Sequence, residues 1–194
     1  MIHFEQSQEP PEFDERCRQR GNQWLAEHPN AARPKDYWTE FKPQLADGFL
    51  DLCAYTVMWA ANGTVDHFLS WKSTRDERPD LAYEWSNYRF CADWMNKSKL
   101  NADDSVLDPF EVEDGWFEIL LPSLQMVITD QVPEHMREKA QYTLIRLHLR
   151  DDERVMRQRR EWYRMYQSGG LPLDELSRKA PLIAAAVRKQ QMEE

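Results

Sequence analysis

The alternation of apolar and polar residues divides the chain into helical segments at both ends and short strands in the middle. Residues 11–29 are framed by prolines and predict a helix. Apolar residues recur at helical spacing in 39–52, which predicts a second helix. Three further helices are predicted at about 133–148, 151–167 and 173–191.

The strand signals lie in the middle of the chain. Residues 53–58 are β-branched and aromatic, a turn signal follows, and 64–68 read as a returning strand, so we expect the two to pair as an antiparallel hairpin. Residues 91–99 predict a short helix packed across that pair. The segments 115–121 and 124–129 predict a second hairpin.

Together these elements predict an α+β fold. We expect a small core, made of a β-hairpin and a helix, and a second short hairpin, both embedded in an α-helical surround. A length of 194 residues suits a single domain. Its expected parts are a helical region 1–52, the core 53–100, an acidic connector with hairpin 101–132, and a helical region 133–194.

Composition restricts the compartment. The chain is 41% hydrophobic with eight Trp, which is enough to bury a core, and we expect the Trp cluster at 59, 71, 85 and 94 to belong to it. No apolar run approaches the roughly 18 residues of a membrane span. The first residues lack a secretion signal, and three widely spaced cysteines do not form a disulfide framework. We therefore expect a cytoplasmic protein without a membrane partner.

The net charge of −9 is unevenly distributed. Residues 101–135 contain nine Asp and Glu and no Lys or Arg, so the rest of the chain is balanced. By contrast, residues 146–166 carry seven Arg against four acids. This basic segment has two interpretations, an exposed helix with internal salt bridges or a surface that binds phosphates. The sequence leaves both open.

Polar residues follow one another in a specific order through the middle region. Asp66 and His67 lie in the second strand, Asn87 in the following loop, and Asn96 and Lys99 on the short helix. In this order the stretch resembles the HNH endonucleases. Their ββα-metal core presents an Asp-His or His-His pair, then an Asn, and finally an Asn or His on the helix.

The resemblance implies metal-dependent cleavage of DNA. His67 would act as general base, since an imidazole pKa of about 6.5 suits proton abstraction near neutral pH. Asp66 and Asn96 would offer oxygens to one divalent cation, Mg²⁺ or alternatively Mn²⁺. Asn87 would belong to the catalytic residues with His67, and it would orient either the loop or the His67 backbone. Phosphate contacts would come from Lys97, Lys99 and Arg89.

Two features limit this interpretation. Neighbouring strand residues point to opposite faces, so Asp66 and His67 can share a cleft only if the strand ends there. Many HNH proteins also hold a structural zinc in two C-x-x-C knuckles, whereas Cys53 and Cys91 each lack the second cysteine. We therefore expect the cleft to form where the strand ends, and no structural zinc.

Related context also comes from the resemblance. Proteins resembling this chain often act in phage defence, sometimes beside an ATPase partner. The alternative from another class is a non-catalytic DNA-binding or protein-interaction module on a decayed nuclease fold. Loss of the knuckle cysteines favours that alternative, whereas retention of Asp66, His67, Asn87 and Asn96 favours the enzyme.

Overall fold

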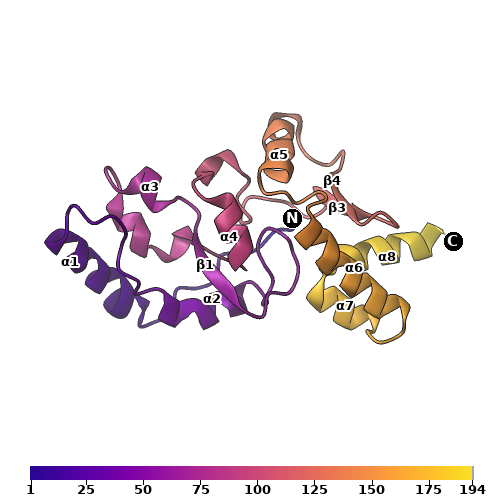
Figure 1. The fold of residues 1–194 in the computed structure, drawn as a ribbon, viewed down its shortest axis with the longest axis horizontal. Coiled ribbons are helices and arrows are strands. Elements are labelled where there is room, and N and C mark those ends of the chain that lie inside the picture. The colour runs from indigo at the N-terminus through magenta and orange to yellow at the C-terminus, as the bar shows by residue number, and fades with distance from the viewer. Residues whose placement is uncertain (194) are drawn as a thin grey trace.

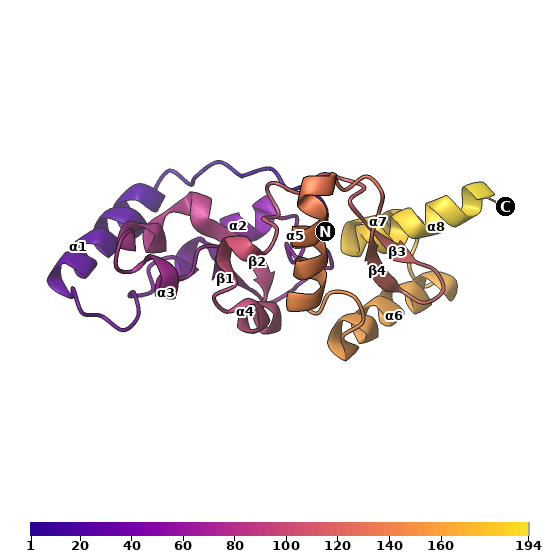
Figure 2. The same cartoon turned by 90° about the horizontal axis from the view of Figure 1, so that it is seen from above.

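The computed structural model describes residues 1–193, and it is an elongated molecule of helices with two small antiparallel sheets. The N-terminal helices lie at one end and the C-terminal helices at the other (Figure 1). The same order along the long axis is visible from above (Figure 2). This mixture agrees with the predicted α+β class. Within the described residues, no helix combines the length and hydrophobicity of a membrane span.

The N-terminal region is helical, as its pattern predicts. The segment predicted as one helix over 11–29 consists of a π-helical run, Asp14–Gln19, that continues into α1, Arg20–Glu27. The 39–52 prediction corresponds to a 3₁₀ turn, Thr39–Phe41, followed by α2, Lys42–Gly48.

The predicted pairing of the first hairpin is wrong. Strand β1, Gly63–His67, pairs antiparallel with β2, Tyr88–Ala92, and not with residues 53–58. Residues 53–58 form a tight turn instead, in which the Cys53 amide donates to the Met58 carbonyl. The apolar residues 53–58 are buried within this turn. Packing in the core removes their side chains from water, so they need no partner strand.

The connection between β1 and β2 contains short helical turns. These are α3, Trp71–Thr74, and the 3₁₀ segments Pro79–Tyr83 and Trp85–Asn87. The helix predicted over 91–99 is α4, Asp93–Lys99, which follows β2 directly and packs on both strands. The result is a strand, loop, strand, helix unit.

The rest of the chain follows the predictions more closely. The second hairpin is confirmed as β3, Phe117–Leu120, and β4, Gln125–Ile128. A 3₁₀ turn, Asp103–Ser105, precedes it. The predicted helix 173–191 is interrupted at Pro181, which begins a new helix. The four C-terminal helices are α5, Glu134–Arg146, α6, Glu153–Gln167, α7, Leu173–Lys179, and α8, Pro181–Glu193.

Candidate active site at the end of strand β1

The strand register separates Asp66 from His67. Asp66 lies opposite Arg89 and His67 lies opposite Tyr88, so the two side chains start on opposite faces of the β1–β2 pair. The tertiary contacts of Asp66 and His67 differ accordingly, because their side chains have no hydrogen-bond partner in common.

The Asp66 carboxylate is enclosed by two donors. The Tyr55 hydroxyl donates to Oδ2 at 2.6 Å, and the Lys99 ammonium donates to Oδ1 at 3.3 Å. Asp66 is 1% exposed and Lys99 is 0% exposed. Burial raises the pKa of the Asp66 carboxyl above its ordinary value, and the Lys99 charge opposes that rise. The pair is thus a buried ion pair with both carboxylate oxygens engaged.

Lys99 also fixes the end of β1. Its ammonium donates to the carbonyls of His67 at 3.1 Å and Phe68 at 2.9 Å, in addition to Asp66. Arg146 caps the end of α4, since its guanidinium donates to the carbonyls of Ser98 and Lys99. The Lys99 ammonium therefore holds the backbone around His67 to α4, and Arg146 in turn holds the end of α4 to α5.

His67 is half-buried, and its ring has defined partners. Nε2 lies 2.9 Å from the Ala82 carbonyl oxygen, and the ring packs edge-on against Trp38 and Tyr88. Because a carbonyl oxygen only accepts, Nε2 carries the proton and the neutral ring keeps its lone pair on Nδ1. Burial lowers the pKa of His67 below its ordinary value, which favours that neutral form.

Asn87 closes the loop between the two strands. Its amide oxygen accepts from the Leu69 amide at 2.8 Å, and its amide nitrogen donates to the carbonyls of Leu69 and Leu81. Asn87 thereby also holds Ala82, one residue beyond Leu81, in position to accept from His67.

The Asn96 side chain contacts the backbone of β1 and makes no hydrogen bond to the side chain of Asp66 or His67 among the described residues. Its amide nitrogen donates to the Val65 carbonyl at 3.2 Å, so Asn96 ties α4 to β1. No group of three or more His, Cys, Asp or Glu residues in the described part of the chain is arranged to hold a metal. With both its oxygens engaged and an ammonium beside it, Asp66 does not fit as a divalent-cation ligand in this arrangement.

Two of the three residues expected to contact phosphates are buried. Lys99 is enclosed as described, and Arg89 donates through Nε to Asp108 at 2.7 Å while its guanidinium stacks on Phe110. Only Lys97 is exposed, and it pairs with Asp93. The expectation that Lys99 and Arg89 lie on a DNA-facing surface is therefore wrong for this structure, because both charges stabilise the core instead.

The cysteines of the incomplete knuckles lie in the core. Cys53 and Cys91 are both buried, and burial raises the pKa of the Cys91 thiol well above its ordinary value. A thiol that resists ionisation is a poor zinc ligand, since thiolates bind the metal. Trp94, in the second half-knuckle, is partly buried and packs beneath Arg154.

The arginines of the basic segment are mostly engaged. In α6, Arg154, Arg157 and Arg164 each pair with a nearby acid at 2.6–3.1 Å. Arg159 is 1% exposed and donates to backbone carbonyls. These four arginines are thus compensated, whereas Arg150 and Arg160 are exposed and have no carboxylate partner among the described residues. The segment therefore combines internal salt bridges with two arginines that remain open to solvent.

Sequence reasoning missed several residues of the site. Tyr55, Trp38 and Ala82 all contact Asp66 or His67, although each lies at least eleven residues away in sequence. Ala82 contributes only a carbonyl, which no side-chain pattern reveals. Tyr55 was assigned to a strand, and its hydroxyl gave no separate signal.

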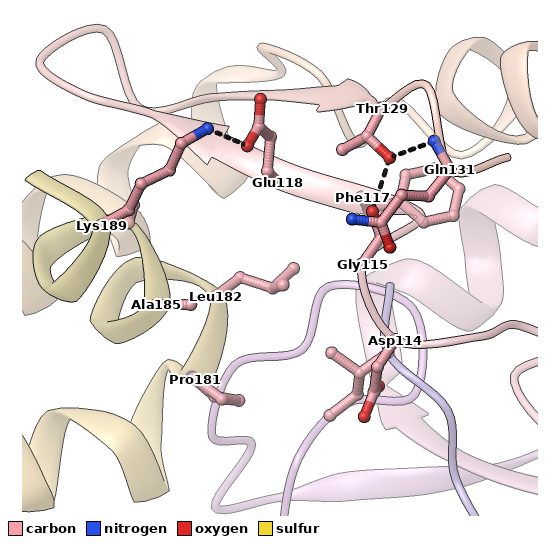
Figure 3. A pocket seen from close by; sticks show the side chains of 12 residues that line it. Asp114, Gly115, Phe117, Glu118, Thr129, Gln131, Pro181, Leu182, Ala185 and Lys189 are labelled. Atoms are coloured by element: carbon pink, nitrogen blue, oxygen red, sulfur yellow. Dashed lines mark hydrogen bonds and ion pairs between the residues drawn. The ribbon is translucent and has the colours of Figure 1, made fainter.

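A separate hollow of about 540 Å³ lies between the β3–β4 hairpin and α8 (Figure 3). Apolar residues such as Phe117 and Leu182 line it, and Lys189 donates to Glu118 at 3.0 Å across it. None of the residues singled out from the sequence lies there, so the hollow is not part of the candidate site.

The chain matches no protein-family model and no curated protein. The HNH interpretation therefore rests on the order of residues in the sequence alone.

Proposed function

We propose that the protein is an endonuclease that hydrolyses phosphodiester bonds in DNA, with His67 as the general base. The observation that carries this proposal is the hydrogen bond between His67 Nε2 and the Ala82 carbonyl. It directs the basic lone pair to Nδ1, and Nδ1 has no hydrogen-bond partner within residues 1–193. The strand, loop, strand, helix order of β1, β2 and α4 supports the same class.

The proposed reaction begins with proton transfer. His67 Nδ1 takes a proton from a water molecule as the water oxygen attacks the phosphorus. The bond between phosphorus and the 3′ oxygen breaks, and the leaving 3′ oxygen takes a proton from solvent water. The lowered pKa of His67 keeps the ring neutral and ready to accept this proton near pH 7. Asn87 holds the loop that carries Ala82, and Lys99 holds the backbone of His67, so both act as positioning residues.

The resemblance also implies a divalent cation, Mg²⁺ or Mn²⁺. Since Asp66 does not fit as its ligand in this arrangement, no step of the proposed reaction is assigned to the metal. A role in phage defence, and an ATPase partner, rest on the resemblance alone.

The second candidate is a non-catalytic DNA-binding or interaction module. The buried ion pair between Asp66 and Lys99 favours it, because an ammonium occupies the place that a catalytic cation would need. In this candidate His67 only packs against Trp38 and Tyr88 and holds the Ala82 carbonyl.

Plasmid cleavage distinguishes the two candidates. Supercoiled and linear DNA are incubated with the protein in Mg²⁺, in Mn²⁺ and in chelator. We expect cleavage by the wild type, and its loss in His67→Ala with DNA binding retained, since a base is not needed to hold substrate. His135→Ala, an exposed histidine on α5, is the matched control. Equal cleavage by wild type and His67→Ala would remove His67 from its role, and no cleavage in any condition would favour the second candidate.

A further inference from the structure

Two exposed cations near the candidate site converge on one aromatic ring. The Arg20 guanidinium lies 4.6 Å from the centroid of the Tyr37 ring, and the Lys35 ammonium lies 5.2 Å from it. Both cations are exposed, whereas Tyr37 is half-buried. We call Arg20, Lys35 and Tyr37 the Tyr37 surface.

The cationic side chains of this surface have no acceptor in the described part of the protein. Within residues 1–193, neither the Arg20 side chain nor the Lys35 side chain has a hydrogen-bond acceptor or a carboxylate partner. Three acids line the hollows beside this surface: Glu40 pairs with Arg16, whereas Asp36 accepts from Thr39 and Glu27 accepts from Gln23, and none of the three pairs with Arg20 or Lys35. This contrasts with α6, where three arginines are already paired.

The surface is hollowed on both sides of Tyr37. One hollow of about 360 Å³ lies between Arg20 and Glu40, and a second of about 450 Å³ extends from Arg20 to Lys35. The second hollow is bordered by Trp24 and His28, whose rings stack in parallel at 4.4 Å. Cations beside flat rings in shallow grooves are the features that track a nucleic-acid strand.

Tyr37 is joined to the candidate active site through its neighbour. Trp38 packs edge-on against His67, with 4.6 Å between ring centroids. Tyr83 contacts both Tyr37 and Trp38, and its hydroxyl donates to the Lys35 carbonyl. These packed rings place the Tyr37 surface beside the candidate active site.

We propose that the Tyr37 surface binds backbone phosphates of the nucleic acid that occupies the His67 site. Arg20 and Lys35 donate to phosphate oxygens on either side of the Tyr37 ring. This inference rests on the proposed nuclease function and moves the DNA-binding surface from α6 to the segment around α1. Sequence reasoning had no signal for it, because the two cations lie fifteen residues apart with no basic run between them.

The test measures binding without cleavage. Fluorescently labelled DNA, single-stranded and duplex, and a matching RNA are titrated in chelator with His67→Ala protein carrying Arg20→Glu and Lys35→Glu. A milder pair, Arg20→Gln and Lys35→Gln, guards against misfolding, which circular dichroism checks. The matched control carries Arg178→Glu and Arg188→Glu, exposed arginines of α7 and α8 near acids at the far end of the molecule (Figure 1).

We expect the Glu pair to weaken binding at least about tenfold and the Gln pair less, with a flatter dependence on salt. The control should bind within about twofold of the parent. Weaker binding of all three nucleic acids supports a site for backbone phosphates. Weaker binding of only one class identifies that class as the substrate. Unchanged binding by both pairs, in a protein whose wild type cleaves DNA, overturns the Tyr37 surface and leaves the nuclease standing. If the wild type neither binds nor cleaves, both proposals fall.

Discussion

At the scale of single residues, the Lys99 ammonium determines how the candidate site is held. It lies among one carboxylate oxygen and two carbonyl oxygens, with no solvent exposure. Such a buried charge is stable only while its partners remain, because an unpaired ion in the interior carries a large desolvation cost. The same contacts that stabilise β1 therefore make Asp66 and Lys99 depend on each other.

This dependence predicts a double-mutant cycle. Lys99→Met should cost about 3–5 kcal/mol, since it leaves the Asp66 carboxylate buried and unpaired. Adding Asp66→Asn should recover part of that loss, because the amide needs no counter-charge. Denaturant unfolding of wild type, both single variants and the double variant measures the coupling. Costs that simply add would show that the two groups do not interact in solution.

His67 predicts a pH dependence of stability. Burial lowers its pKa in the folded protein below the unfolded value of about 6.5. The unfolded chain thus binds a proton more readily than the folded protein does. As the pH falls from 6.5 to the folded pKa of His67, the free energy of unfolding therefore decreases by up to about 1.4 kcal/mol per pH unit. His67→Gln should remove this part of the loss.

The measurement is the free energy of unfolding at pH 7.5 and at pH 5.5. His28→Gln is the control, since His28 is an exposed histidine. A fall in stability that is identical in wild type and His67→Gln would contradict a neutral imidazole whose pKa is lowered in the folded protein.

At the scale of elements, local sequence patterns were sufficient to predict strands that pair across a short turn. They were not sufficient to predict the pairing of strands that lie far apart in the sequence. The β3–β4 hairpin was predicted because its strands adjoin a short turn. The partner of β1 was missed, since β2 lies about twenty residues further on and its polar surroundings resemble a loop. Most helices were predicted, yet the buried positions of Lys99 and Arg89 could not be, because a charged side chain favours exposure at both positions.

Within α6, the structure separates a folding arginine from surface arginines. Arg159 donates to the carbonyls of Leu124, Leu149 and Arg150, which joins the β3–β4 turn to the start of α6. Burial lowers the pKa of its guanidinium to about 10, and it has no paired carboxylate within hydrogen-bond distance among the described residues. Arg157, by contrast, is exposed and pairs with Glu153.

We therefore predict different costs for the two arginines. Arg159→Met should lower the free energy of unfolding by about 3 kcal/mol or more, since three buried carbonyls lose their donor. Arg157→Ala should cost no more than about 0.5 kcal/mol, as for other exposed pairs one turn apart. Thermal and denaturant unfolding measure both. Equal small costs would show that solvent satisfies the three carbonyls when Arg159 is absent.

At the scale of the whole molecule, Trp59 joins the central unit to the C-terminal helices. Its amide donates to the Lys179 carbonyl at 2.8 Å, and its carbonyl accepts from Gln158 at 3.0 Å. The Lys179 ammonium lies 4.2 Å from the Trp59 ring, and Trp162 packs against the same ring edge-on. One residue thus connects β1's surroundings with both α6 and α7.

This connection predicts that the elongated chain unfolds as one unit. Trp59→Ala removes the ring contacts but keeps both backbone hydrogen bonds, so it should cost about 2–3 kcal/mol, less than a fully buried Trp. If the two ends are coupled, far-ultraviolet circular dichroism and Trp fluorescence should still report one coincident transition, shifted to lower denaturant. Trp24→Ala, a half-buried Trp of α1, is the control for loss of a ring far from this joint. Two separated transitions in the wild type would instead assign the central unit and the C-terminal helices to independent domains, and Trp59→Ala would then leave the stability of each nearly unchanged.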